Sequence, residues 1–150
     1  MREFADPVPG PLEIRVAVKA VGLNRADLLQ RRGLYPPPPD VAPDILGLEF
    51  AGEVEALGAQ ATRFKKGERV MGVVGGGAYA EKLLIHEGAA MHVPGSLDFP
   101  RAAAVPEAFL TAFDALLLQA LLQPGEHLLV HAVASGVGTA ALQLGKLVGA

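Results

Sequence analysis

Hydrophobic residues occupy every second position along residues 12–20, and Glu13, Arg15 and Lys19 lie between them. Successive side chains of a β-strand point to opposite faces, so this pattern predicts a strand with one buried face. The apolar face would carry Leu12, Ile14, Val16, Val18 and Ala20.

Short apolar runs separated by glycine turns continue between residues 47 and 93. Four of them, over 51–57, 69–74, 79–86 and 90–93, have the length and composition of strands. Several short strands at this spacing predict a small β-barrel.

The segment between these strands combines a short helix with a stiff loop. Asn24 is a good N-cap residue with an acid, Asp27, three positions later, and Gly33 stands where a left-handed helix stop is expected. The four prolines at 36–39 then impose an extended connector, which places Tyr35 at its mouth.

The apolar spacing changes from strand-like to helical after Pro94 and Gly95. A helix is predicted to begin near Pro106 and to end before Pro124. This change predicts a domain boundary near residue 100, with one domain over 1–100 and the start of another over 101–150.

A glycine-rich turn lies between an apolar run at 127–132 and a helical pattern at 137–148. The run predicts a strand of a parallel sheet that is covered on both faces. In a strand-turn-helix unit the free N–H groups at the helix start stabilise a pyrophosphate, here at Ser135, Gly136, Val137 and Gly138. The alternative is that the glycines only permit a tight turn.

Composition narrows the classes of partner. The chain has 150 residues, 51% hydrophobic and 19% charged, with a net charge of −3. These values indicate a globular domain, and the absence of a basic run argues against nucleic acid as a partner. No signal pattern or apolar span of about 20 residues is present, so the expectation is a cytoplasmic protein that is not a membrane partner.

Other candidate chemistry is weak. The chain has no cysteine, and His127 and His131, although four residues apart, lie in an apolar run without a nearby carboxylate, so no metal site is predicted. No serine has the context of an acyl-transfer nucleophile. Tyr35 could stack on a flat ring or donate a proton, or could simply pack on the prolines, and Asn24 could be only a helix cap.

Five segments together carry a family resemblance. They are GLNRADL at 22–28, GLYPPP at 33–38, ILGLEFAGEV at 45–54, AAAVPEAFLTAF at 102–113 and LVHAVASGVGTA at 129–140. In this order they resemble the medium-chain dehydrogenase/reductase superfamily. Within it the chain is most similar to the quinone oxidoreductase branch, in particular the group that includes the p53-inducible quinone oxidoreductase and its bacterial relatives.

The resemblance implies a mixed fold, a GroES-like β-barrel followed by the opening βα unit of a Rossmann α/β domain. It implies an enzyme that transfers a hydride from NADPH, bound in the cleft between the two domains, to a small-molecule quinone. Asn24 and Tyr35 would then be catalytic and would face the nicotinamide, Thr111 would line the cleft from the Rossmann side, and residues 135–138 would bind the pyrophosphate. The full-length parent would be a homo-oligomer.

The resemblance also implies that zinc is not used. Zinc-dependent members carry Gly-His-Glu where this chain has Gly47, Leu48 and Glu49, and a leucine cannot bind metal. They also commonly carry four cysteines for structural zinc, and this chain has none.

The chain departs from the family pattern in length and at Ser135, where many relatives have glycine. Relatives usually begin with a further strand and continue for another domain, so the expectation is a fragment truncated at both ends. One alternative function is therefore a non-catalytic GroES-like module that a partner completes. An enoyl or alkenal reductase of the same superfamily is another. The residue that distinguishes NADPH from NADH is expected about 20 residues beyond the glycine-rich turn, past Ala150.

Overall fold

The computed structural model describes residues 3–39, 41 and 45–150. The described chain divides into two compact units, which we call the N-terminal unit (Met1–Ala104) and the C-terminal unit (Val105–Ala150). Each is described by itself below.

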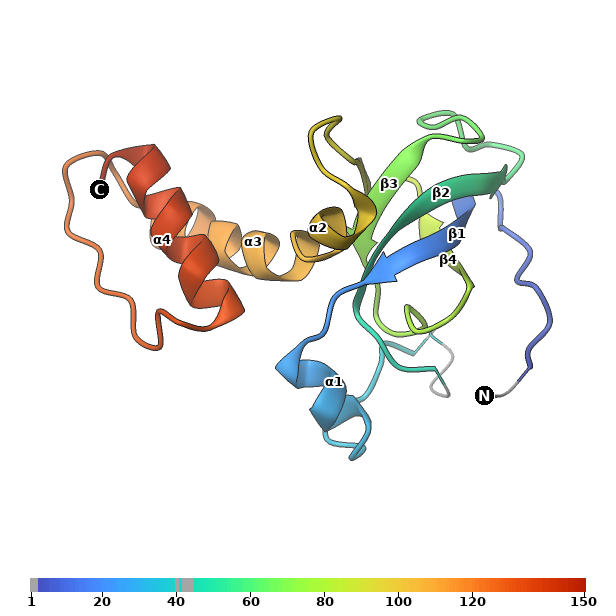
Figure 1. The fold of residues 1–150 in the computed structure, drawn as a ribbon, viewed down its shortest axis with the longest axis horizontal. Helices are drawn as coiled ribbons and strands as arrows, with labels where there is room; N and C mark the ends of the chain where they lie inside the picture. Colours follow the sequence, from blue (N-terminus) through green and yellow to red (C-terminus); the bar gives the residue numbers. More distant parts are fainter. Residues whose placement is uncertain (1–2, 40, 42–44) are drawn as a thin grey trace. The chain divides into compact units, whose positions relative to one another are not determined.

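The N-terminal unit is built on a curled, five-stranded antiparallel sheet, the half-barrel of the expected GroES-like fold (Figure 1). Its spatial order is β4-β1-β2-β3-β5. The strands are β1 (Glu13–Val21), β2 (Glu49–Leu57), β3 (Arg69–Val73), β4 (Lys82–His86) and β5 (Ala90–His92).

The predicted strands are confirmed to within three residues at their ends. In β1, Ile14 and Val16 are fully buried, as the alternation requires. Irregular register between β1 and β2, at Arg15/Val16 and Val18/Ala20, increases the local twist and bends the sheet. The concave side is filled by Ile14, Val16, Phe50, Val54, Phe64, Val70, Ala78, Leu83, Ile85 and Ala90.

Two short helices flank this sheet. The helix α1 (Arg25–Gln30) confirms the prediction from Asn24, which is its N-cap residue. Gly33 has a φ of +70°, and the N–H of Leu34 donates to the carbonyl of Leu29, so this helix ends in the predicted left-handed stop. The helix α2 (Phe99–Ala103), which packs on β1, β2 and β3, was not predicted.

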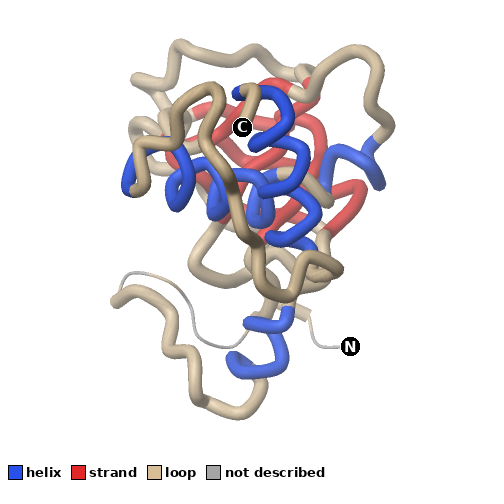
Figure 2. The backbone as a smooth tube through the Cα atoms, turned by 90° about the vertical axis from the view of Figure 1, so that its left-hand side faces the viewer, coloured by secondary structure: helices blue, strands red, loops and turns tan. Residues whose placement is uncertain are grey.

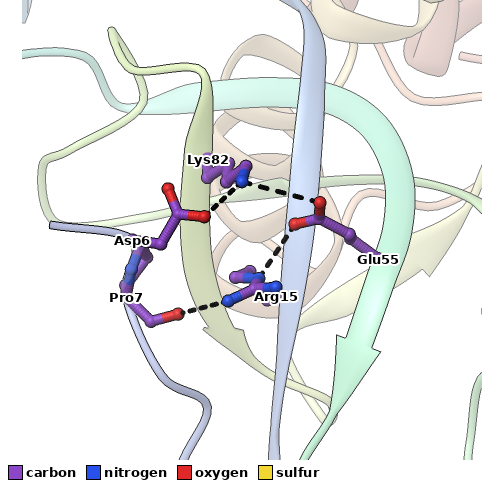
Figure 3. Close-up of polar contacts among 5 residues, drawn as sticks. All are labelled: Asp6, Pro7, Arg15, Glu55 and Lys82. Atoms are coloured by element: carbon purple, nitrogen blue, oxygen red, sulfur yellow. Dashed lines mark hydrogen bonds and ion pairs between the residues drawn. The ribbon is translucent and has the colours of Figure 1, made fainter.

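An ion-pair cluster ties the segment before β1 to the outer edge of the sheet (Figure 3). Lys82 on β4 lies between the carboxylates of Asp6 and Glu55. Arg15 on β1 pairs with Glu55 on β2 at 2.9 Å and donates to the carbonyl of Pro7 at 3.2 Å. Three strands and the N-terminal segment are thereby joined by four charged side chains.

The C-terminal unit consists of helices and loops (Figure 2). The helix α3 (Pro106–Phe113) continues into the π-helix η1 (Asp114–Gln119), in which the N–H of Ala120 donates to Ala115, five residues back. The helix α4 (Gly136–Val148), which the apolar spacing predicts, packs against α3. Ala112, Ala140 and Ala141 are buried between them.

The structure does not form the strand predicted at 127–132. Residues 127–130 form no regular secondary structure, with Leu128 and Val130 half-buried and Leu129 80% exposed, and no described strand pairs with them. Ala132 lies in a turn with a φ of +52°. A strand is stabilised by a hydrogen-bonded neighbour, and none of the described residues of this unit provides one.

Over the described residues, none of the helices combines the length and the apolar character that crossing a bilayer requires.

Candidate functional site

In the N-terminal unit, the two loops at 45–48 and 75–79 converge on α1. Gln30, the last residue of α1, accepts from the N–H of Gly47 at 3.2 Å and donates to the carbonyl of Gly75 at 3.1 Å. The two loops also bond to each other, since the N–H of Tyr79 donates to Leu46 at 2.9 Å. This framework holds the residues that surround Asn24.

The side chain of Asn24 does more than cap the helix. Its amide Nδ2 donates to Oε1 of Glu49 at 2.8 Å, a contact between the start of α1 and the start of β2. Glu49 is 3% exposed, and its carboxylate folds over Gly22, where any Cβ would overlap it. The amide is therefore held against a carboxylate that has no room to move toward β1.

A buried acid lies beneath Asn24. Asp27 is 6% exposed, and its Oδ2 accepts from the backbone N–H of Asn24 at 2.6 Å and from the hydroxyl of Tyr79 at 2.7 Å. The first contact is the carboxylate half of the predicted capping box. The other oxygen, Oδ1, is buried and has no hydrogen-bond partner among the described residues.

Tyr79 is locked by its surroundings. Its ring lies against Gly47, which has a φ of +101° and leaves no space for a Cβ. Partial burial, followed by the hydrogen bond to Asp27, raises the pKa of the Tyr79 hydroxyl above its ordinary value of 10.0. The hydroxyl is protonated at neutral pH and acts as a donor to Asp27.

Tyr35 lies in the loop that precedes the prolines, 43% exposed. Its hydroxyl makes no hydrogen bond with the described part of the chain. The loop itself is placed by close packing, because a Cβ on Gly75 would lie 2.6 Å from Cδ of Pro38. Tyr35 is thus available to a ligand, while the role predicted for it stays a prediction.

The predicted pyrophosphate turn forms the start of α4 in the C-terminal unit. Ser135 is the N-cap residue, and its Oγ accepts from the N–H of Gly138 at 3.0 Å. The N–H of Thr139 donates to the carbonyl of Ser135 at 2.8 Å. The N–H groups of Gly136 and Val137 have no acceptor among the described residues, and both residues are exposed. Two free donors at the positive end of a helix suit an anion.

The two glycines of this turn have different surroundings. A Cβ on Gly138 would lie 2.6 Å from the carbonyl oxygen of Ala132 and 2.7 Å from Cα of Val133, so the helix packs on the preceding turn only with glycine there. At Gly136 a Cβ would meet only Ala108, at 3.8 Å, which leaves the backbone approachable. Thr111 is an exposed residue of α3 in the same unit.

Metal-binding geometry is not found in the described parts of the chain, where no three histidine, cysteine or acidic side chains come together. Leu48 is 3% exposed beside Glu49, so an apolar side chain fills that position. His127 and His131 are both exposed in the loop before α4.

Comparison with known proteins identifies the class. The model of the alcohol dehydrogenase GroES-like domain matches residues 10–95, more than half of the chain. The chain belongs to this GroES-like domain family. Its relatives place it more narrowly, in the quinone oxidoreductase group of the medium-chain dehydrogenase/reductase superfamily, as its sequence motifs predict.

Three relatives illustrate the similarity. A quinone oxidoreductase of Pseudomonas aeruginosa is 45% identical over 99% of this chain and 45% of its own length. The crystal structure of Escherichia coli quinone oxidoreductase complexed with NADPH is 37% identical with a TM-score of 0.85, over 99% of this chain and 45% of that one. The CurK enoyl reductase is 32% identical with a TM-score of 0.90, over 99% of this chain and 47% of that one. The chain therefore spans about half the length of these relatives.

The sequence points to Asn24 as a candidate site residue but not to the residues that hold it. Asp27 was interpreted only as part of a helix cap, and Glu49 only as a neighbour of Leu48. Tyr79 was interpreted as a strand residue. The sequence signal for Asp27 and Glu49 is that each is an acid within a motif of the family resemblance, GLNRADL and ILGLEFAGEV.

Proposed function

We propose that the chain contributes the catalytic barrel and the first part of the nucleotide-binding domain of an NADPH-dependent quinone oxidoreductase that works without zinc. The observation that carries this proposal is the start of α4, where Gly136 and Val137 present two free N–H groups on exposed backbone. Relatives with this fold are named quinone oxidoreductases, and one of their structures is a complex with NADPH.

The residues at the start of α4 fit a dinucleotide. The free N–H groups of Gly136 and Val137 would hold the pyrophosphate, aided by the dipole of a helix of 13 residues. Gly138 keeps the helix close to the turn, and Ser135 caps it, so these residues set the donors before any ligand arrives. When bound, reduced nicotinamide supplies a hydride, which a quinone accepts together with a proton to become the hydroquinone.

The residues of the N-terminal unit would then position the reacting rings. Asn24 would direct its carboxamide, fixed by Glu49, toward the nicotinamide, and Tyr35 would place its exposed ring or hydroxyl against the substrate. Hydride transfer between two flat rings is accelerated largely by aligning the rings and excluding water. The reaction therefore does not require an exposed acidic side chain at the site. Thr111 would contribute from α3.

Zinc independence is supported by the residues at the metal position of zinc-dependent relatives. Leu48 supplies no ligand atom, and it is buried, so another residue cannot easily take its place. The adjoining acids have other partners, since Glu49 receives the amide of Asn24 and Asp27 receives the hydroxyl of Tyr79.

A second candidate function is enoyl reduction. The CurK enoyl reductase matches almost the whole chain with a TM-score of 0.90. The two functions share the cofactor and differ in the acceptor, which is an activated carbon–carbon double bond in place of a quinone. Parallel assays of NADPH oxidation with 1,4-benzoquinone and with an enal, in this chain and in any longer reading frame that contains it, discriminate between them.

Calorimetric titration with NADPH and NADH tests the nucleotide site, and one position offers a matched pair of variants. Gly136→Pro removes a single N–H group, and Pro suits the first position of a helix that follows an extended residue such as Ser135, with φ of −74° and ψ of 163°. Gly136→Ala keeps the N–H group. We expect Gly136→Pro to weaken NADPH binding by about tenfold, equivalent to about 1.4 kcal/mol, and Gly136→Ala to leave it nearly unchanged.

Two results would contradict the proposal. Equal affinity in both variants would exclude the start of α4 as the pyrophosphate site. Absence of binding heat with either nucleotide in the unmodified chain would favour the non-catalytic GroES-like module instead.

A further inference from the structure

The hydrogen bonds around Asn24 form a chain that begins at a residue 55 positions away. Tyr79 donates to Asp27, Asp27 accepts the backbone N–H of Asn24, and the amide of Asn24 donates to Glu49. Asp27 and Glu49 are both more than nine-tenths buried. The backbone and the side chain of Asn24 are thus each held by a different buried carboxylate.

A buried carboxylate is costly unless it is satisfied, so its presence requires an explanation. Asp27 accepts two hydrogen bonds at Oδ2 and leaves Oδ1 without a partner among the described residues. Capping a helix of six residues does not by itself need a buried acid, because an exposed one at the same position makes the same contact.

Tyr79 is held in a fixed position beside Asp27. Its ring is held by Gly47, and its backbone N–H is held by Leu46, so its hydroxyl approaches Asp27 from a fixed direction. The Tyr79 hydroxyl and the backbone N–H of Asn24 together hold Oδ2 of Asp27 in place. Loss of the hydroxyl would leave the Asp27 carboxylate free to rotate toward its unpartnered side.

We propose that Asp27 and Tyr79 are positioning residues, which fix the orientation of the Asn24 side chain and thereby its action on the nicotinamide and quinone. The inference rests on the proposed function of Asn24. Neither residue needs to touch a ligand, because both act through the backbone of Asn24 and the start of α1.

The test combines a direct measurement of Asn24 with kinetics. The ¹⁵N relaxation of the Asn24 carboxamide reports how tightly the side chain is held, in the 150-residue chain and without any ligand. The variants are Tyr79→Phe, which removes one hydroxyl, Asp27→Ala, which removes both contacts, and Asp27→Asn, which retains an acceptor oxygen. Kinetics give kcat and KM for a quinone and Kd for NADPH.

A matched control is available in the same unit. Glu87 is also 6% exposed, and its Oε2 accepts from the N–H groups of Thr62 and Arg63 at 2.7 Å each. Glu87→Ala removes a buried carboxylate and two backbone hydrogen bonds far along the chain from Asn24. It reports the effect of lost stability alone.

We expect Tyr79→Phe and Asp27→Ala to increase the mobility of the Asn24 carboxamide and to reduce kcat by about tenfold, with little change in the Kd for NADPH. Asp27→Asn should restore part of both losses. Glu87→Ala should lower thermal stability and leave the Asn24 signal and kcat unchanged.

Unchanged mobility of Asn24 in Tyr79→Phe would overturn the inference, and this variant is conservative enough to fold if Asp27→Ala does not. Increased mobility with an unaltered kcat would overturn it as well, by showing that the contact is structural only. If the unmodified chain neither binds NADPH nor reduces a quinone, the proposed function fails, whereas the relaxation data still report on Asn24.

Discussion

At the residue scale, Lys82 is the side chain that joins the most distant parts of the N-terminal unit. It contacts Asp6, 76 residues earlier in the chain, and Glu55 on β2. The hydrogen bond to Lys82 holds the pKa of the Asp6 carboxyl below its ordinary value of 3.8, and the same contact raises the pKa of Lys82. This pair, together with the hydrogen bond from Arg15 to the carbonyl of Pro7, anchors the segment before β1.

The Asp6–Lys82 pair predicts a dependence of stability on pH. A carboxyl with a lowered pKa in the folded state stabilises the fold above its unfolded pKa, and this contribution is lost as the pH falls through the folded value. Asp6→Asn should therefore lower the urea midpoint at pH about 7 and have no effect well below the ordinary value of 3.8. Urea titrations of both proteins from neutral to acid pH measure the difference.

High salt provides the control for this prediction. Asp6 is exposed and Lys82 is partly exposed, so added salt at the level of about 1 M should screen the pair and reduce the difference at neutral pH. A difference that stays constant from neutral to acid pH would show that Asp6 acts through packing and not through its charge.

The residues of the candidate site could be predicted from the sequence only where their partners are local. The capping of α1 by Asn24 follows from an asparagine and an acid three residues apart, and the structure confirms the contact with Asp27. The bond from Tyr79 spans 52 residues, and it depends on the curl of the sheet and on Gly47, which no local pattern encodes. Long-range polar pairs of this kind need the fold first.

At the element scale, the start of α4 is determined by glycine. Gly138 is buried, and its backbone lies directly against Ala132 and Val133. The close approach sets the direction in which the helix leaves the turn, and hence the direction of its free N–H groups.

Gly138→Ala is therefore expected to destabilise the C-terminal unit. The added methyl would lie 2.6 Å from the carbonyl oxygen of Ala132, which is backbone and cannot rotate away. Overpacking of this kind costs about 1–3 kcal/mol, which outweighs the gain of up to about 1 kcal/mol that alanine brings to a helix. Circular dichroism at 222 nm during urea unfolding measures the change.

Gly136→Ala, in the same turn, is the appropriate comparison. It has the same gain in helix propensity and no overlap, since only Ala108 comes within 4 Å. Equal stability of the two alanine variants would show that the close packing at Gly138 is not needed.

The elements of this chain were predictable to different degrees. Strand β1 follows from alternation, and strands β2 to β5 follow from short apolar runs between turns. Helix α2 was missed, although Asp98 caps it and Pro100 lies in its first turn, since five residues carry too little periodicity. The segment at 127–130 has the apolar composition of a buried strand but lacks a neighbouring strand among the described residues, and sequence alone does not show which neighbour is present.

At the scale of the whole molecule, the two units differ in what they bury. The N-terminal unit encloses large side chains such as Phe50, Ile14 and Val16. In the described part of the C-terminal unit, the buried members of the core cluster are three alanines, and the larger side chains packed against them, Phe109, Leu116, Val130 and Leu144, are only partly buried. Leu129 and Leu147 are each at least 80% exposed. Each fully buried large side chain stabilises by about 1.5–3 kcal/mol, and alanine contributes far less.

The two units should therefore open with different free energies. Native-state hydrogen exchange is expected to show that the amides of α4 open at least about 2 kcal/mol more easily than those of β1 and β2. Addition of NADPH should protect α4 preferentially, because ligand binding stabilises the unit that binds it. A single opening free energy for all amides, with and without NADPH, would contradict both statements.

The close packing of Glu49 against Gly22 restricts which substitutions this site can accept. A Cβ at position 22 would overlap the Glu49 carboxylate, so a side chain there requires that carboxylate to shift. Because the same carboxylate accepts the amide of Asn24, a longer residue at 22 or a shorter one at 49 is expected to disturb Asn24 as well. In a mutant library, we therefore expect substitutions at positions 22, 24 and 49 to be tolerated more often in combination than one at a time.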